Sequence, residues 1–390
     1  MRIIIPLFFL MSLILFLKKE EKKQNIIKID VESRIDSNKS PIDLSDFIES
    51  VTYCPLETRS DNLIGANPEY IITDKEIVVR TFSDCYIFKR ETGEFLRKIG
   101  KNGKGPREYR KTSGFVNPYC KELFFIGWKG NLLKYNMDGT FLKSILIPEY
   151  VNSVEVPSFP TNFTWLKNNI VLYFSNMTGS EKKLLMIIDE EGEILASHPN
   201  NNYYNKPKGM ISMNLEESQF YHFNQDLYFK EDYSDTVFKI SGSEMIPKMI
   251  LFLGRYQPSY KLKSMTSQKR KELKYQPIGL RNLIETNSFL FFEYHYQRKL
   301  YQGIYNKNTD RLRITNKENG INNDIDGFIS FSPISITSDG YLVGVIEAYK
   351  LLLWFYENSE KALELPLHIQ KLKNIKDTDN PVIMIAKLKE

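Results

Sequence analysis

Short runs in which apolar and polar residues alternate recur along the chain, and glycine-containing turns separate them. Three segments align without gaps, at residues 86–99, 132–145 and 185–198. Alternation with a period of two predicts β-strands. The eighth residue of each segment is Gly93, Gly139 or Gly192, and glycine readily adopts the positive φ that a tight hairpin turn needs. Each segment is therefore predicted to be a β-hairpin.

The spacing of these hairpins predicts the architecture. The three glycines are 46 and 53 residues apart, and weaker copies of the unit follow at 235–242 and 303–314. A further unit begins near residue 330. A repeat of this length is typical of the four-stranded blade of a β-propeller. Six strand clusters over residues 65–390 thus predict an all-β fold, a six-bladed β-propeller.

The last repeat unit departs from this alternation. Residues 347–375 carry apolar positions at helical spacing, interrupted by Pro366, which predicts a small helical insertion in the last blade. The insertion has too many apolar side chains, Trp354 among them, for a free surface helix. We expect it to pack across one end of the propeller and partly cap the channel. The opposite face would then be the working face.

The two ends of the propeller are expected to meet. An open ring would leave unpaired sheet edges, which natural proteins avoid. Strand-like runs lie at 51–56 and at 382–388. We therefore expect the N-terminal run to pair with the C-terminal run and close the ring, so that residues 41–390 form one domain.

An apolar run of 15 residues, 3–17, follows Arg2 and precedes a lysine-rich stretch. This is the length of a signal-peptide core and falls short of the roughly 20 residues of a membrane span. It predicts export to the periplasm or cell envelope, with 1–17 as a signal-like segment and 18–40 as a charged tether. Neither a small-residue cleavage site nor a lipid-attachment Cys follows the run, so lipid anchoring is not expected at this terminus. Cleavage and an uncleaved anchor both remain open, and a buried N-terminal element is the alternative to export.

Four stretches carry a family resemblance, namely 47–58 with 63–65, 97–109, 323–327 and 379–388. In these stretches the chain resembles the six-bladed propellers of exported, often lipid-anchored proteins of Bacteroidetes-type bacteria, which are similar in shape to NHL-repeat propellers. The resemblance spans nearly all of the chain after residue 40, although the lipid-attachment Cys is missing. It implies the fold and export, but little about activity, because a fold does not fix a function.

Composition narrows the range of functions. The chain has 53 Lys and Arg against 48 Asp and Glu, and a net charge of +5 spread over 390 residues gives no case for a nucleic-acid partner. With 4 His and 3 Cys, metal chemistry and a disulfide scaffold are disfavoured, so we expect no metal and no cofactor. The cysteines are expected to be buried free thiols. We expect a monomer whose membrane contact is limited to the N-terminal segment.

Candidate binding residues begin with a basic, glycine-rich segment at 100–109. Lys101, Lys104 and Arg107, with Tyr109 at the end of the segment, could hold a phosphate or carboxylate together with backbone N–H groups. The segment lacks the Ser or Thr that follows Gly-Lys in a P-loop. A bent crossover between two blades accounts for its glycines at least as well.

Three further candidates each have a structural alternative. His222 and His295 lie beside aromatic residues in predicted strands, and no metal-ligand spacing accompanies them, so packed or exposed histidines are the simpler interpretation. Residues 322–327 offer oxygen atoms at the close spacing of a calcium loop, but turn chemistry explains them equally.

Two long, polar loops, 199–215 and 254–280, hold several tyrosines among basic residues: Tyr203, Tyr204, Tyr256 and Tyr260, with Lys261, Lys263, Lys269, Arg270, Lys271 and Lys274. Exposed aromatic rings on a propeller face could stack on sugar rings or peptide side chains. Surface loops without a ligand are the alternative.

Two functions follow from these observations. The first is an exported, non-catalytic propeller that binds a protein or glycan partner on one face. The second is a propeller enzyme, a hydrolase or lyase, that acts on a polysaccharide. Paired carboxylates on innermost strands at one channel mouth would favour the enzyme. The chain holds no strong catalytic motif, so binding is favoured.

Overall fold

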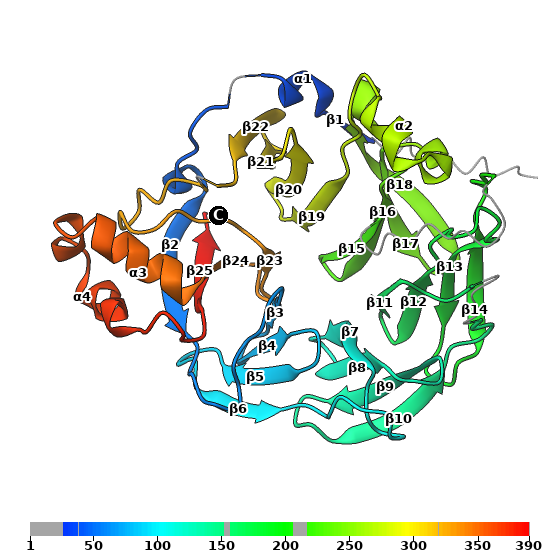
Figure 1. Ribbon diagram of the computed structural model, residues 1–390, viewed down its shortest axis with the longest axis horizontal. Helices are drawn as coiled ribbons and strands as arrows, with labels where there is room; N and C mark the ends of the chain where they lie inside the picture. Colours follow the sequence, from blue (N-terminus) through cyan, green and yellow to red (C-terminus); the bar gives the residue numbers. More distant parts are fainter. Residues whose placement is uncertain (1–25, 38, 152–156, 206–216, 319, 390) are drawn as a thin grey trace, which may run out of the picture.

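Six small β-sheets are arranged around a ring (Figure 1). The computed structural model describes residues 26–389 except 38, 152–156, 206–216 and 319. In each sheet four strands pair antiparallel with their neighbours, from the centre of the ring outward. The prediction of a six-bladed β-propeller with a helical insertion is confirmed.

The strands of the first five blades follow one another in the chain. Blades one to three contain β3 (Glu69–Ile72), β4 (Glu76–Arg80), β5 (Cys85–Lys89), β6 (Phe95–Lys98), β7 (Lys111–Asn117), β8 (Glu122–Ile126), β9 (Asn131–Asn136), β10 (Phe141–Leu146), β11 (Asn162–Leu166), β12 (Asn169–Tyr173), β13 (Lys183–Ile188) and β14 (Ile194–Pro199). Blades four and five contain β15 (Ser218–Phe223), β16 (Asp226–Glu231), β17 (Thr236–Ser241), β18 (Glu244–Phe252), β19 (Leu280–Glu285), β20 (Phe289–Tyr296), β21 (Lys299–Asn306) and β22 (Arg311–Asn316).

The sixth blade joins the two ends of the chain. Its strands run in the order β23 (Ser335–Ile336), β24 (Leu342–Ile346), β25 (Val382–Leu388) and β2 (Ile48–Pro55). β2 pairs antiparallel with β25 over its whole length, from Ile48 opposite Leu388 to Pro55 opposite Val382. The expected closure of the ring by an N-terminal strand is confirmed.

A side-chain clasp reinforces this closure. Ser45 N–H donates to Asp324 Oδ1 over 2.8 Å, and the Tyr53 hydroxyl donates to Asp326 Oδ2 over 2.8 Å. The oxygen-rich stretch 322–327 therefore uses its carboxylates to hold the N-terminal segment in place. This supports the interpretation as structural turn chemistry.

Part of the segment expected to be a tether is structured. β1 (Ile27–Asp30) adds a fifth strand to blade four, parallel to β18, and the short helix α1 (Glu32–Ile35) follows it. Ile29, Val31 and Ile35 are buried in the apolar cluster between blades four and five. Residues 1–25, and with them the predicted signal-like segment, lie outside the described residues.

Buried apolar side chains fill each of the six seams between neighbouring blades. For example, Ile87 of blade one meets Leu123 of blade two, and Ile284 of blade five meets Val382 of blade six, each pair in one buried cluster. Both faces of a blade are thus covered by its neighbours. This explains why middle strands such as β12 read as nearly continuous apolar runs.

The helical insertion packs against the sixth blade at the rim of the ring. It contains α3 (Ala348–Glu357) and the short helix α4 (Leu367–Gln370) between β24 and β25. Leu351 is fully buried, and the Trp354 ring lies 4.6 Å from that of Phe328. Figure 1 places both helices beside β2 and β25, away from the centre of the ring. The predicted packing is confirmed, but the prediction that the insertion caps the channel is wrong.

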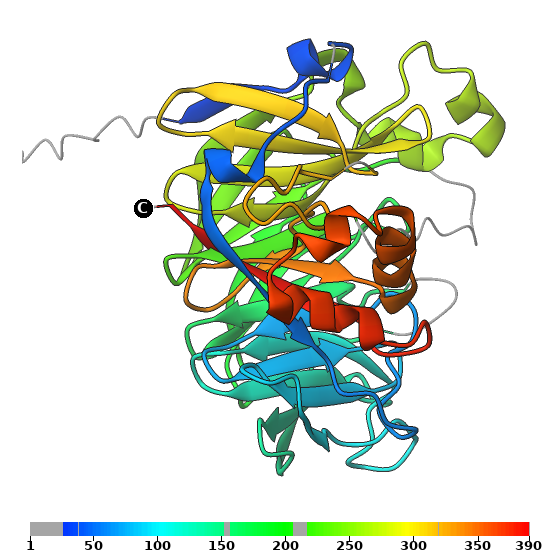
Figure 2. The same cartoon turned by 90° about the vertical axis from the view of Figure 1, so that its left-hand side faces the viewer.

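The connections divide unequally between the two faces of the ring. Neighbouring strands within a blade run in opposite directions. The loops that join the second strand to the third, and the loops that join one blade to the next, therefore lie at the same end of the sheets. These loops include 99–110, 253–279 and the helical insertion, and we call this end the loop face. Figure 2 shows α2 (Ser267–Lys271), α3 and α4 on one side and the C-terminus on the other. The insertion therefore shares its face with the long loops, which contradicts the expectation of a working face opposite to it.

The closure can be tested by N-terminal truncation. A chain that begins at residue 41 loses β1, α1 and their buried side chains but keeps β2, so we expect a folded protein with a lower Tm. A chain that begins at residue 58 loses β2 and the buried side chains of Leu44, Phe47 and Ile48, each worth about 1.5–3 kcal/mol. We expect it to lose cooperative unfolding in circular dichroism. Equal Tm values for the two chains would contradict the closure.

Candidate functional site

Charged side chains are buried under the loop face, where blades three, four and five meet the segment 253–279. Six residues form what we call the buried charge cluster: Glu217, Lys230, Glu231, Asp232 and Lys263, which are buried, and Arg281, which is half-buried. Glu217 directly precedes the innermost strand β15, and Lys263 belongs to the 3-10 helix η3 (Tyr260–Ser264). Burying charges is costly unless they are paired and hydrogen-bonded, so their partners decide what the cluster does.

The centre of the cluster is an ion pair between Glu217 and Lys263, both of which are buried. Lys263 Nζ lies 2.8 Å from Glu217 Oε1 and donates to the carbonyl oxygen of Asn176 over 2.9 Å. The second carboxylate oxygen of Glu217 accepts from the Tyr233 hydroxyl over 3.2 Å. Through this pair the segment 253–279 is attached to blades three and four.

A second buried carboxylate lies beside the first. The Tyr173 hydroxyl lies 2.8 Å from Glu231 Oε1 and 3.1 Å from Glu217 Oε1, and the Tyr260 hydroxyl also donates to Glu231. Burial raises the pKa of Glu231 and the neighbouring Glu217 adds to the rise, while the hydrogen bonds from Tyr260 and Tyr173 oppose it. The carboxyl of Glu231 is thus biased toward its protonated form.

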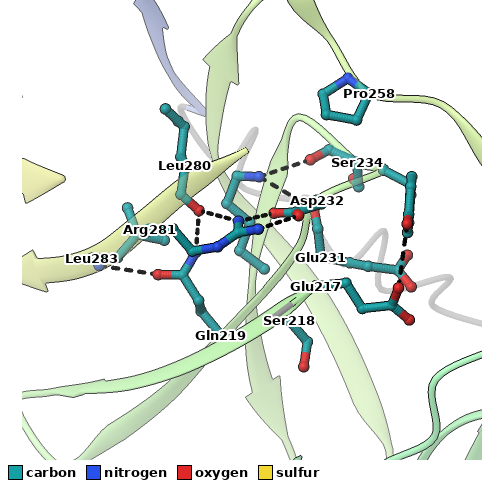
Figure 3. Close-up of polar contacts among 12 residues, drawn as sticks. Glu217, Ser218, Gln219, Glu231, Asp232, Ser234, Pro258, Leu280, Arg281 and Leu283 are labelled. Atoms are coloured by element: carbon teal, nitrogen blue, oxygen red, sulfur yellow. Dashed lines mark hydrogen bonds and ion pairs between the residues drawn. The ribbon is translucent and has the colours of Figure 1, made fainter. Parts of the chain in front are cut away.

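The third acidic residue ties blade four to blade five (Figure 3). Asp232 holds Arg281 by two parallel contacts, one of them 2.7 Å between Oδ2 and Nη2. Bidentate pairs of this kind fix geometry as well as charge. Next to it, Leu283 N–H donates to Gln219 Oε1 over 3.2 Å.

Lys230 is fully buried and has no carboxylate partner among the described residues. Its ammonium group donates to the carbonyl oxygens of Glu231, over 3.2 Å, and Ser234, over 3.1 Å. Burial lowers the pKa of Lys230 to about 8, and the nearby carboxylate of Asp232 opposes this shift. The turn between β16 and β17 therefore closes around a lysine.

The pair of carboxylates has one property of a glycosidase centre. Because both Oε1 atoms bond the same hydroxyl, they lie within about 6 Å of each other, a separation that such enzymes use. However, protein donors occupy these oxygens, and both side chains are buried. The arrangement therefore suits a support that positions the segment 253–279.

The structure brings two of the predicted binding residues to this cluster. Lys263 Nζ lies 5.8 Å from the ring centre of Tyr204 and 5.6 Å from that of Tyr260. The Tyr204 hydroxyl donates to the carbonyl oxygen of Asn176 over 2.7 Å. Both tyrosines thus have structural partners. The loop 199–215 is described only up to residue 205.

Three other predicted residues are packed within the propeller, Tyr109 and Tyr256 being buried and His222 half-buried. The Tyr109 hydroxyl donates to the carbonyl oxygen of Ile99 over 3.0 Å, so the segment 100–109 is held as a crossover between β6 and β7. Tyr256 is buried against α1. The His222 ring stacks on Trp165 at 3.8 Å, and burial lowers its pKa to about 4. His222 is a packed histidine, as the simpler interpretation expects.

The remaining four predicted residues are exposed: Lys101, Arg107, Tyr203 and His295. Lys101 lies 3.5 Å from Glu108, and Arg107 lies over the ring of Phe141. Among the cysteines, Cys54 and Cys85 are buried as expected, whereas Cys120 is exposed.

Sequence reasoning missed most of the buried charge cluster. A usable signal was the run Lys230–Asp232, three charged residues at the end of an apolar strand, which is unusual for a segment that enters a buried seam. Nothing local marks Glu217 as a partner of Lys263, because 46 residues separate them in the chain.

These features define a class: a six-bladed β-propeller closed by its N-terminal strand, with its long connections on one face. The chain belongs to a family described as a domain of unknown function, DUF4934, whose model matches residues 26–387. No match was found among curated proteins.

One solved structure supports the fold. The chain is similar to a protein of Bacteroides fragilis that is inferred to be exported, with 18% identity and a TM-score of 0.67, over 94% of this chain and all of the other. At this identity the likeness concerns the fold alone. The extracellular domain of a hybrid two-component system from B. thetaiotaomicron matches at 10% identity and a TM-score of 0.37, over 76% of this chain and 32% of the other, and this match carries no argument.

In the part of the chain that the structure describes, no helix has the length and apolar character to cross a membrane. Over the same residues, no group of three or more His, Cys, Asp or Glu side chains is placed to hold a metal ion.

The support role of the cluster predicts a large effect of Lys263. In Lys263→Met, Glu217 remains buried without its cation, and breaking a buried pair in this way costs roughly 3–5 kcal/mol. The exposed neighbour Lys261 provides the control, since Lys261→Met should change stability by less than about 0.5 kcal/mol. Urea unfolding measures both. Equal stability of the two variants would contradict the role assigned to the ion pair.

The pKa of Lys230 predicts a dependence of stability on pH. The folded protein binds the ammonium proton of Lys230 less tightly than the unfolded chain does, where the pKa is 10.5. The charged lysine therefore lowers the free energy of unfolding below about pH 8, and this penalty disappears as the pH rises above 8. Relative to Lys230→Met, the wild type should therefore gain stability as the pH rises from 8 to 10.5. Urea unfolding of both proteins at several pH values measures the difference. A constant difference would show that Lys230 is not perturbed.

Proposed function

We propose that this protein is an exported, non-catalytic propeller that binds a protein or glycan partner on its loop face. The observation that carries the proposal is the concentration of long connections on this face, one of which, 253–279, is attached by the buried charge cluster. A rigid scaffold that positions loops is the usual arrangement of a binding protein. Exposed aromatic side chains on the same face, such as Tyr203, offer contact area.

The proposed cellular location is the periplasm or cell envelope. It rests on the apolar run 3–17 and on the likeness to a Bacteroides protein inferred to be exported. The run is followed by no cysteine, which argues against lipid attachment at this point. The likeness to NHL-repeat propellers is part of the same proposal.

A polysaccharide hydrolase or lyase is the second candidate. The close pair Glu217 and Glu231, with the raised pKa of Glu231, is the observation that favours it. An acid and a base need access to a substrate, however, and both carboxylates are buried and bonded to tyrosines and a lysine. Binding without turnover therefore fits the geometry better.

Site-selective shielding tests the proposed face. Cys120 is exposed in the loop between β7 and β8, on the face opposite to the loop face, and Ser267 is exposed at the start of α2. A large maleimide-polyethylene glycol would be attached to Cys120 in the wild type, or to residue 267 in Ser267→Cys with Cys120→Ser. Both proteins would then be presented with purified polysaccharides and cell-envelope extract.

We expect the attachment at residue 267 to abolish capture of the partner and the attachment at Cys120 to preserve it. Equal capture by both conjugates would contradict the loop face as the binding surface. Release of shortened glycans by the unmodified protein would instead favour the enzyme.

A further inference from the structure

A strip of aromatic and basic side chains, all exposed except the half-exposed Lys111, crosses the loop face where blades one and two meet. It contains Phe82, Lys104, Arg110, Lys111 and Trp128, and we call it the aromatic–basic strip. Phe82 lies in the loop between β4 and β5, and Trp128 lies in the loop between β8 and β9. The three basic residues come from the crossover between the two blades and the first residue of β7.

Contacts between neighbours make the strip continuous. Lys111 Nζ lies 5.0 Å from the ring centre of Phe82, and the Arg110 guanidinium lies 5.3 Å from that of Trp128. Lys104 Nζ approaches the same indole at 5.5 Å. Because Arg110 and Lys111 are adjacent in the chain, they link the two rings across the seam. Both rings remain accessible, with 69% of Phe82 and 46% of Trp128 exposed.

The backbone beneath the strip is held in place before any ligand arrives. The Trp128 indole N–H donates to the carbonyl oxygen of Gly103, and Arg110 N–H donates to the carbonyl oxygen of Ile126 over 2.8 Å. Tyr109, between the basic residues, is fully buried. A surface held in this way loses little conformational entropy on binding.

The strip carries uncompensated positive charge. Within the described residues, Lys104, Arg110 and Lys111 form no ion pair with a carboxylate, and neither does the exposed neighbour Lys129. Glu108, the acidic residue of the crossover, is engaged by Gly105 N–H and by Lys101. Many other lysines and arginines of the blades, such as Lys134 and Lys317, are paired. The strip is thus open to an external anion.

We propose that the aromatic–basic strip binds an anionic polysaccharide, one whose sugars carry carboxylate or sulfate groups. This rests on the proposed function and names its ligand class and surface. Cations at intervals along a line match a charge that recurs along a polymer, and exposed rings present apolar area to the C–H faces of sugars. A protein partner is a poorer match, because the centres of protein interfaces are depleted in lysine.

Charge reversal at matched positions on the two faces tests this proposal. The strip variant is Lys104→Glu, Arg110→Glu and Lys111→Glu. The control variant is Lys75→Glu, Lys121→Glu and Lys167→Glu, which makes the same change of charge at exposed lysines in turns of the opposite face. Affinity electrophoresis in gels containing chondroitin sulfate, polygalacturonate or neutral dextran measures binding, and circular dichroism verifies that each variant is folded.

We expect the wild type and the control variant to bind at least one of the two anionic polymers but not dextran, and the strip variant to lose at least tenfold in affinity. A second variant, Phe82→Ala with Trp128→Ala, should weaken binding without changing the charge. Equal binding by the strip and control variants would overturn the proposal, as would failure of the wild type to bind either anionic polymer. Binding of duplex DNA as tightly as the glycans would overturn the ligand class.

Failure of this proposal can be distinguished from failure of the proposed function. If shielding of residue 267 abolishes capture of a partner but the strip variant captures it normally, the loop face stands and the strip is excluded. If neither conjugate nor variant changes capture, both proposals fail.

Discussion

The pairing of β2 with β25 is the interaction on which the ring depends. The four antiparallel strands of every other blade are consecutive in the chain, whereas the sixth blade gains its fourth, outermost strand from the opposite end of the chain. Without it, β25 would present an open edge, and buried side chains such as Phe47 and Ile48 would leave the last seam. The carboxylates of Asp324 and Asp326 add polar contacts to the same closure. The closed ring gives the loops a fixed platform.

Within the closed ring, the buried charge cluster fixes the position of one loop segment. It connects the segment 253–279 to blades three and four through Lys263, and it joins blade four to blade five through Asp232 and Arg281. Charged groups cost free energy when buried, so their value here lies in the single geometry that satisfies all partners. One side of the propeller thereby holds its long connections in place, while the other consists mainly of short hairpin turns.

Much of the fold was accessible from sequence because propeller blades repeat. The hairpin glycines and their spacing predict six blades, and the need to cover sheet edges predicts the closing strand. β1 was missed, since a short strand added in parallel at an edge has no local signal. The position of the helical insertion was predicted wrongly. Its apolar residues show that the helix packs against the protein, but they do not show which surface it covers. The buried charge cluster was not predicted, because its members come together only when the ring is folded. Tyr260 and Lys263, however, lie in a loop that the sequence analysis had selected as a candidate binding loop.

Amide hydrogen exchange of the wild-type protein, followed by mass spectrometry, tests the closure most directly. If β2 is an integral strand of the sixth blade, the amides within Ile48–Pro55 that bond β25 should exchange together with those of Val382–Leu388, and only through unfolding of the whole propeller. Fast exchange of β2 while β25 stays protected would show that the N-terminal strand is a dispensable addition, and would contradict the account.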